Sequence, residues 1–202
     1  MVDNNVSKYW DMQAKRKIVS GDLDNIWKRQ VIVRNLLEYD FYDKSVLEIG
    51  VGPGTTFASI GLILLNRFSY VGTDTSSVYV DFASKKWGMN TVQSDVTNLP
   101  GKNNSYDYIV SLDTLAHVKV DQRKDGYKEM NRVLKSSGKI ILNITVKGTE
   151  LDPNEFHWGF SYYDLEELVK ICSLKLEKVK AYDVKIPITG EVRSYEFIVG
   201  GR

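Results

Sequence analysis

The sequence is poor in cysteine, histidine and proline. Its 202 residues include one cysteine, two histidines and four prolines. The single cysteine, Cys172, excludes an intramolecular disulfide framework and is compatible with a reducing compartment. We expect no metal site. There is no internal repeat and no low-complexity tract, and the length fits one domain with a sizeable core.

Long apolar runs and an excess of charge are also missing. No apolar stretch reaches the ~20 residues that a membrane-spanning helix needs, and residues 1–17 contain no apolar secretory core. We therefore expect no association with a membrane and a cytoplasmic location. Lys and Arg number 27 against 26 Asp and Glu, a net charge of +1. This balance excludes a strong global field that would attract nucleic acid, although it leaves a local basic patch open.

Residues 1–42 form the most basic part of the chain, and their pattern favours helix. Asp24 can cap a stretch in which Ile26, Val33 and Leu37 fall near one face. From Ser45 onward short β-rich runs alternate with helical patterns. We therefore divide the chain into an N-terminal helical segment, 1–42, and a core, 43–202. The basic residues of the segment are Lys8, Lys15, Arg16, Lys17, Lys28, Arg29 and Arg34.

The β-rich runs are separated by stretches with helical spacing and recognisable ends. Strands are predicted at 45–50, 68–74, 90–95, 106–112 and 138–145, followed by an antiparallel pair at 174–184 and 192–201. One helix is expected to start at Thr75 or Ser76 and end at Gly88, and another to end at Gly138. A third opens with Ser161 and Asp164 as a capping box and buries Leu165, Leu168 and Cys172.

Strands that alternate with helices predict an α/β fold with a parallel sheet between two helical layers. In such sheets ligands bind beyond the carboxyl ends of the strands. The loop that follows the first strand is rich in glycine and reads "VLEIGVGPGTT" over 46–56. A dinucleotide fingerprint, G-x-G-x-x-G, would need a third glycine at Thr55 or Phe57. Pro53 also lacks the N–H that a pyrophosphate would use. The loop therefore favours an adenosine ligand without phosphates.

Acids follow the next two strands. Asp74 can accept hydrogen bonds from two ribose hydroxyls. Asp95 can accept from an exocyclic amine, and the backbone N–H of Val96 can donate to a ring nitrogen, so the pair can recognise an adenine edge. The competing interpretations are that Asp74 caps a helix and that Asp95 forms a turn.

Together these motifs resemble the class I S-adenosylmethionine-dependent methyltransferases. The resemblance rests on the order of Glu48-x-Gly50-x-Gly52-x-Gly54, Asp74, "SDVTNLP", "YDYIVSLDTLAHV" and "EMNRVLKSSGKIIL", over roughly residues 45–143. It implies a three-layer sandwich with a doubly wound, mostly parallel seven-stranded sheet whose last strand is antiparallel. It also implies that S-adenosylmethionine is the cofactor and S-adenosylhomocysteine the product. The cofactor-binding residues it implies are Glu48, Gly50, Gly52, Gly54, Asp74, Thr75, Asp95, Val96, Ser111 and Leu112.

The resemblance says less about the acceptor. Tyr9 and Trp10 are candidates for a lid over the cofactor, or else pack on an amphipathic helix. His117 is a weak candidate for a general base, with a structural role as the alternative, and Asp113 can be a helix cap. The acceptor site is predicted near "FHWGFSYY", at His157, Trp158 and Tyr162, where surface packing is the competing account.

Methyl transfer needs positioning more than a catalytic triad, so four functions stay open. The first is a methyltransferase that acts by in-line displacement on a small-molecule acceptor. The second is one that acts on a protein or RNA, with the basic segment as its docking surface. The third is a dinucleotide-dependent oxidoreductase, against which the incomplete fingerprint argues. The fourth is a non-catalytic module that binds an adenosyl cofactor. The motif [DN]-P-P-[FYW] of nucleic-acid nitrogen methyltransferases is absent, since "SLDT" stands there. We therefore expect a small-molecule partner rather than nucleic acid.

Overall fold

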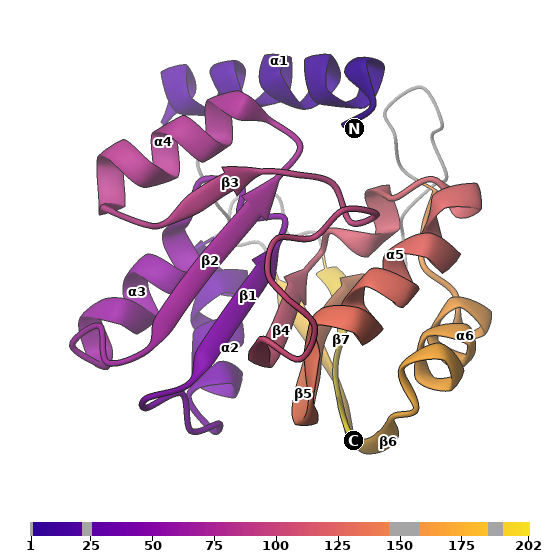
Figure 1. The fold of residues 1–202 in the computed structure, drawn as a ribbon. Coiled ribbons are helices and arrows are strands. Elements are labelled where there is room, and N and C mark those ends of the chain that lie inside the picture. Colours follow the sequence, from indigo (N-terminus) through magenta and orange to yellow (C-terminus); the bar gives the residue numbers. More distant parts are fainter. Residues whose placement is uncertain (1, 22–25, 146–157, 186–191) are drawn as a thin grey trace. The chain divides into compact units, whose positions relative to one another are not determined.

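The structure is a computed structural model that describes residues 2–21, 26–145, 158–185 and 192–202 (Figure 1). The chain forms two compact units, residues 1–95 and 96–202. The predicted N-terminal segment falls inside the first unit, and its boundary at residue 42 stays a prediction. Among the described residues, no helix is both long and apolar enough to span a bilayer.

Among the described residues of the first unit, three parallel strands combine with four helices. Strand β1 pairs with β2, and β2 pairs with β3, both in parallel. Helix α1 lies against α4, and α4 packs on β2 and β3 (Figure 1). The elements are α1 (Asn4–Ser20), α2 (Ile26–Leu36), β1 (Ser45–Ile49), α3 (Thr55–Ile63), β2 (Ser69–Asp74), α4 (Ser77–Trp87) and β3 (Thr91–Gln93).

The second unit carries the antiparallel strand. Strand β4 pairs with β5 in parallel, whereas β7 runs antiparallel to both β5 and β6. Helices α5 and α6 contact each other. The elements are β4 (Tyr106–Leu112), the short 3-10 helix η1 (Leu115–His117), α5 (Val120–Val133), β5 (Leu134–Thr145), α6 (Tyr162–Cys172), β6 (Lys175–Lys185) and β7 (Val192–Gly201).

The strand order is β3-β2-β1-β4-β5-β7-β6, which gives a seven-stranded sheet. Its last strand, β7, is antiparallel to its neighbours. The expected fold class, a mostly parallel seven-stranded sheet with an antiparallel last strand and flanking helices, is therefore confirmed.

Several helix ends form as the local sequence predicts. Ser76 is the N-cap of α4, where its hydroxyl accepts from the Tyr79 amide, and Gly88 ends that helix in the left-handed conformation. Ser161 and Asp164 form a reciprocal capping box on α6. These caps satisfy backbone groups that a helix end would otherwise leave without partners. The caps predicted for α4 and α6 are thus confirmed, while Asp24 lies outside the described residues.

The predicted end of α5 at Gly138 was wrong. The helix stops at Val133, and Leu134 already has extended backbone, with ψ at 131°. Leu134 pairs with Tyr106 on β4, and regular pairing then resumes at Tyr108 with Lys139, after a bulge. Gly138 is needed for a different reason: a Cβ there would lie 2.6 Å from a methyl carbon of Leu134. Close packing, and not a helix end, requires this glycine.

Cys172 behaves as a buried apolar residue, as expected. It is fully buried on α6, and its thiol donates to the Tyr127 carbonyl over 3.4 Å. Burial raises the pKa of the thiol to about 12. The Cys172 thiol therefore keeps its proton near neutral pH.

Candidate functional site

The glycine loop after β1 turns back on β2. The amides of Gly50 and Val51 both donate to the Thr73 carbonyl over 2.8 Å, and the Gly54 amide donates to the Val51 carbonyl over 2.9 Å. Gly50, Gly52 and Gly54 have φ values of 81°, 50° and 75°. These are left-handed conformations that glycine adopts without a steric penalty. The loop therefore needs its glycines to make this turn.

Gly52 and Gly54 have different surroundings. A Cβ on Gly54 would lie 2.9 Å from the Met89 sulfur and 3.0 Å from the Ala83 Cβ, so this glycine allows the loop to pack on α4. A Cβ on Gly52 would meet nothing within 4 Å. Gly52 is thus the position where the loop backbone lies open to a ligand that approaches it closely.

Asp74 is tied to this loop by its side chain. One carboxylate oxygen accepts from the Gly52 amide and the other from the Ser76 amide, each over 2.9 Å. Burial raises the pKa of Asp74 to about 6; these two amides oppose the shift, and the charge of Asp11 adds to it. Each carboxylate oxygen can accept more than one hydrogen bond, so both can still receive a ribose hydroxyl. The helix-cap alternative is excluded because Ser76 holds the N-cap position.

Helix α1 is anchored to the same turn. The Asp11 carboxylate accepts from the Ser76 hydroxyl over 2.7 Å and from the Val78 amide over 3.2 Å. Gln93, at the end of β3, donates to the Thr75 carbonyl over 2.9 Å and to the Ser7 hydroxyl over 3.3 Å. Helix α1 and β3 therefore hold the turn at 74–78 from two sides. No local pattern in the sequence predicts these contacts, because Asp11 and Ser76 are 65 residues apart.

Tyr9 and Trp10 lie on this anchored helix. Their rings meet edge to face with centroids 5.1 Å apart, and both side chains are partly exposed. Such a pair is compatible with the lid and with the packing alternative, so the lid stays a prediction.

Glu48 has a structural partner. Its carboxylate is buried on β1 and accepts from the Tyr70 hydroxyl on β2. Burial, followed by the charge of Glu48, raises the pKa of Tyr70 well above its ordinary value, so the phenol keeps its proton. A Cβ on Gly72 would clash with that hydroxyl. Glu48 thus joins β1 to β2, and its contact with a cofactor stays a prediction.

The residues predicted to hold the adenine end lie beyond β3. Asp95 is partly buried and Val96 is buried. A Cβ on Gly126 would lie 2.8 Å from the Val96 side chain, so α5 packs closely on Val96 through a glycine. The adenine contacts of Asp95 and Val96 stay predictions.

In the second unit, Ser111 and Leu112 end β4. Ser111 is 1% exposed, and its buried hydroxyl has no hydrogen-bond partner among the residues that the structure describes. A buried hydroxyl without a partner costs free energy that a polar ligand atom could recover. Leu112 lies opposite Asn143 of β5. The predicted contacts of both residues with the methionine end are untested.

The segment after β4 and the segment before α6 are held together. The Trp158 amide donates to the Ala116 carbonyl over 2.9 Å. Arg123, on α5, donates to the Val118 carbonyl over 3.1 Å and also to the Gly159 carbonyl. The same guanidinium forms a buried ion pair with Asp164 over 2.8 Å. Arg123 therefore fixes both segments to α5 and α6, a role that the sequence did not reveal.

These contacts locate the predicted acceptor residues. His117 ends η1 and Trp158 is partly buried, so the Trp158–Ala116 bond brings their segments together. Tyr162 is exposed at the start of α6, where its hydroxyl donates to Glu196 over 2.6 Å. His157 lies outside the described residues. The roles of His117, Trp158 and Tyr162 stay predictions.

The expectation that Asp113 caps a helix was wrong. Thr114 holds the N-cap position of η1. The Asp113 carboxylate instead accepts from the Asn143 amide over 3.0 Å and the Thr145 hydroxyl over 3.4 Å. Both partners lie at the carboxyl end of β5, which only the pairing of β4 with β5 brings close.

Among the described residues, no group of three or more His, Cys, Asp or Glu side chains is arranged to hold a metal ion.

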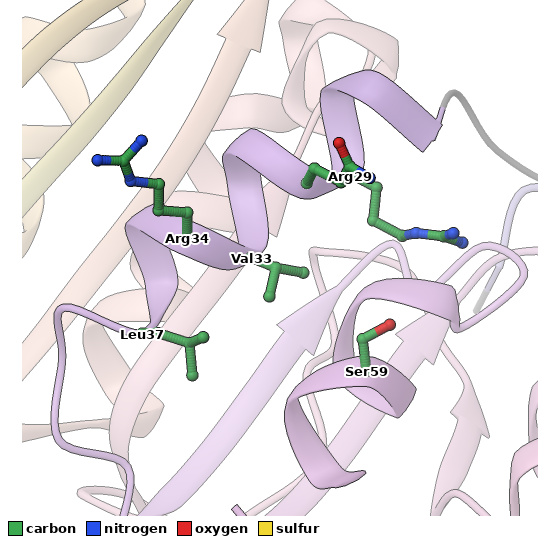
Figure 2. Close-up of a pocket in the computed structure, with 6 residues that line it drawn as sticks. Arg29, Val33, Arg34, Leu37 and Ser59 are labelled. Atoms are coloured by element: carbon green, nitrogen blue, oxygen red, sulfur yellow. The ribbon is translucent and has the colours of Figure 1, made fainter. Parts of the chain in front are cut away.

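A separate groove of about 450 Å³ lies between α2 and α3. Val33 and Leu37 form its apolar part, while Arg29 and Arg34 extend in opposite directions (Figure 2). Gln30 and Ser59 complete the lining, which includes none of the residues predicted to bind cofactor or acceptor.

Comparison with known proteins agrees with this geometry. A family model described as a methyltransferase domain matches residues 46–138. An uncharacterized protein of Methanocaldococcus jannaschii is 31% identical over 142 residues, which are 69% of this chain and 51% of that protein. A putative methyltransferase of Encephalitozoon cuniculi is 30% identical over 112 residues, 55% of this chain and 50% of that protein. The chain thus spans about half the length of the curated relatives it matches.

Solved structures share the fold. A protein of Thermotoga maritima, described as a SAM-dependent and possible histamine N-methyltransferase, superposes with a TM-score of 0.69 at 19% identity, over 97% of this chain and 99% of that one. Phosphoethanolamine N-methyltransferase 2 of Haemonchus contortus, in complex with S-adenosyl-L-methionine, gives 0.66 at 14% identity, over 87% of this chain and 52% of that one.

Proposed function

We propose that the chain is a class I S-adenosylmethionine-dependent methyltransferase that transfers a methyl group to a small-molecule acceptor. The match of a methyltransferase-domain model to residues 46–138 and the fold shared with solved S-adenosylmethionine-dependent methyltransferases support this proposal. The proposed cofactor rests on one observation. The Asp74 carboxylate accepts a hydrogen bond from the Gly52 amide over 2.9 Å. This hydrogen bond sets the Asp74 carboxylate, which we propose holds the ribose, beside a backbone position where a Cβ on Gly52 would meet no atom within 4 Å.

The residues of the first unit fit this cofactor. Asp74 would hold the ribose, and the glycine loop would lie against a part of the ligand that carries no phosphate. The cofactor supplies an activated methyl group on a sulfonium, so the protein mainly has to orient donor and acceptor. The rigid turn at 74–78, which Asp11 and Gln93 support, serves that orientation.

Two features support a small acceptor. The charges of the chain nearly cancel, at 27 basic against 26 acidic residues, so no strong field favours a polyanion. Two of the solved neighbours, those of Thermotoga maritima and Haemonchus contortus, are described as acting on small amines, with the former only a possible assignment. At 19% and 14% identity, these likenesses show a shared fold alone. The acceptor of this chain is therefore a proposal.

The test begins with calorimetry against S-adenosylmethionine, S-adenosylhomocysteine and NAD in parallel. We expect the first two to bind and NAD to give no heat. Labelled S-adenosylmethionine is then incubated with the protein and a cell extract that is split by size. Label in the small-molecule fraction supports the proposal. Label confined to protein or RNA contradicts it.

The basic N-terminal segment favours a second candidate, a methyltransferase that acts on a macromolecule. Helices α1 and α2 carry seven Lys and Arg residues. If that surface docks a polyanion, activity will fall steeply as salt rises, because bound counterions are released on docking. Activity that changes little between low and physiological salt argues against this candidate.

The cofactor affinity is expected to depend on pH through Asp74. Only the ionised carboxylate can accept from both ribose hydroxyls while it also holds the two loop amides. Because the pKa of Asp74 is raised to about 6, the Kd for S-adenosylhomocysteine should rise about tenfold per pH unit below that value. Calorimetry between pH 5 and 8 measures this change.

Replacing the neighbouring acid, Asp11, tests whether Asp74 causes the pH dependence of the affinity. Asp11→Asn keeps a hydrogen-bond acceptor for Ser76 but removes the charge that adds to the pKa of Asp74. The decline in affinity should then begin at lower pH than in the wild type. Asp81→Asn, at an exposed position on the same helix α4, should leave the profile unchanged. A flat profile in the wild type would reject Asp74 as the titrating group.

A further inference from the structure

Glu196 is a buried acid without a cationic partner among the described residues. It lies on β7 and is only 7% exposed. One carboxylate oxygen accepts from the Tyr162 hydroxyl of α6 over 2.6 Å. The other oxygen, Oε2, is buried and has no hydrogen-bond partner in the part of the chain that the structure describes. The ion pairs of that part do not include Glu196. A glutamate is rarely buried to this degree unless it is paired.

The contact with Tyr162 leaves the charge of Glu196 uncompensated. A neutral hydroxyl stabilises the anion through one hydrogen bond but does not cancel its charge. The hydrogen bond to Glu196, followed by the charge of Glu196, raises the pKa of Tyr162, so the phenol stays a donor. A buried carboxylate without a cation costs free energy that a bound positive group would recover. A water molecule would satisfy Oε2 as an acceptor but would leave the charge in place.

The residues paired with Glu196 supply no positive charge. They are Ile144 of β5 and Ala181 of β6. Ser194 lies two residues before Glu196, on the same face of β7, and pairs with Asp183. Asp183 therefore lies diagonal to Glu196, and its exposed carboxylate accepts from the Ser194 hydroxyl over 2.6 Å. The charged group diagonal to Glu196 is thus a second acid, which adds to the negative potential.

Ala181 marks the side from which a ligand can approach Glu196. It is exposed, and its side chain is a single methyl group directly opposite Glu196. Val179 lies two residues earlier on the same face of β6 and is also exposed. Tyr162, whose hydroxyl holds the first carboxylate oxygen, is exposed as well. A charged group that reaches Glu196 over Ala181 would therefore lay its apolar part against Val179.

We propose that Glu196 and Asp183 bind an organic ammonium ion, whose alkyl part lies against Ala181 and Val179. An ammonium group suits the site because it brings both the missing positive charge and N–H donors for Oε2. Glu196 makes the stronger contact, since a buried environment weakens electrostatic attraction less than an exposed one. The described residues provide no group of three or more His, Cys, Asp or Glu side chains for a metal ion, which favours an ammonium ion.

This inference goes beyond the proposed function and does not depend on it. Glu196, Asp183, Ala181 and Val179 all belong to the second unit. Binding of the ammonium ion therefore needs no residue of the first unit and no S-adenosylmethionine. The experiments use the full chain without cofactor, so their outcome is separate from that of the methyl-transfer assay.

The first test compares three cations. Butylammonium, tetramethylammonium and magnesium chlorides are titrated at equal ionic strength into isotope-labelled protein and followed by NMR. Butylammonium should shift the amide signals around Ala181 and Glu196 and reach saturation. Tetramethylammonium carries the charge without an N–H donor and should bind at least about tenfold more weakly. Equal affinity for the two ammonium ions, shifts with magnesium alone, or no saturation with butylammonium overturns the proposal.

The second test removes the charge. Glu196→Gln keeps an oxygen that can accept from Tyr162. Its affinity for butylammonium should fall at least about tenfold. Its midpoint of urea denaturation without ligand should rise, because the variant no longer buries an uncompensated charge, whereas loss of a purely structural contact would lower that midpoint. Asp183→Asn should weaken binding about threefold, and Glu166→Gln, at an exposed position on α6, should not change it. Wild-type affinity in Glu196→Gln overturns the proposal.

The third test builds the ammonium group into the chain. Ala181→Lys places a permanent cation opposite Glu196, so it should raise the urea midpoint and abolish the binding of butylammonium. Ala181→Met has a side chain of similar length without the charge and serves as the control. In the Glu196→Gln background, Ala181→Lys should bring no gain. If Glu196→Gln folds poorly, the comparison of lysine with methionine still decides. A lysine variant that is no more stable than the methionine variant overturns the assignment.

Discussion

Replacing Asp74 with alanine is expected to weaken the binding of S-adenosylmethionine by at least about 100-fold. Two charge-assisted hydrogen bonds to the ribose would be lost, each worth about 1.5–3 kcal/mol. The amides of Gly52 and Ser76 would also lose their acceptor, which loosens the loop on which the ligand rests. Calorimetry with S-adenosylhomocysteine measures the loss directly, without dependence on the acceptor.

Two further variants show whether the loss of affinity in Asp74→Ala comes from the carboxylate of Asp74. Asp81→Ala removes a carboxylate from the exposed surface of α4, where it pairs with Lys85, and it should bind the ligand as the wild type does. Asp74→Asn keeps the volume but can offer only one acceptor oxygen, so its affinity should lie between those of wild type and Asp74→Ala. Wild-type affinity in a folded Asp74→Ala protein would remove the ribose assignment.

Replacing Arg123 with methionine is expected to lower the free energy of unfolding by about 3–5 kcal/mol. The guanidinium and the Asp164 carboxylate are only 3% and 12% exposed, and breaking such a pair leaves a charge without its partner in a buried place. Although burial opposes it, hydrogen bonds from Ser161 and Arg123 hold the pKa of Asp164 below its ordinary value. Urea denaturation at pH 7 measures the loss.

The sign of the pH dependence follows from that lowered pKa. A carboxylate whose pKa is depressed on folding adds stability above its unfolded pKa, and this contribution disappears as the pH falls through the folded value. The gap between wild type and Arg123→Met should therefore be widest near neutral pH and shrink below about pH 4. Adding Asp164→Leu should restore part of the stability, because it removes the stranded charge. Lys128→Met breaks an exposed pair with Asp125 on the same helix and should change the free energy of unfolding far less than Arg123→Met, because solvent screens the pair.

The parts of this molecule that could be predicted from the sequence depend on short-range rules. The Ser161–Asp164 box spans three residues, and the Ser76 cap acts within one helical turn. The loop glycines were predictable because their left-handed backbone admits few other residues. The place of Asp74 at the carboxyl end of β2 could be predicted from the strand pattern, and its contact with a ribose stays a prediction.

The remaining features depend on contacts between distant segments. Asp113 looked like a helix cap because the sequence places it just before η1, yet its partner is Asn143, 30 residues away. Arg123 reaches Gly159 across 36 residues. Gly138 follows a helical pattern, but the pairing of Leu134 with Tyr106 ends the helix first. For Asp113 and Gly138, the pairing of β4 with β5 decides between local alternatives that the sequence leaves nearly equal. For Arg123, the packing of distant segments on α5 decides.

The anchor between Asp11 and Ser76 has a consequence for the order in which the chain folds. During synthesis α1 is made well before the turn that holds it. Closing a loop of 65 residues costs on the order of 4 kcal/mol in chain entropy. Helix α1 therefore cannot dock as it leaves the ribosome and must wait until β2 and the start of α4 have formed. Its attachment is a late event in biogenesis, and an incomplete chain would present α1 with its acidic anchor exposed.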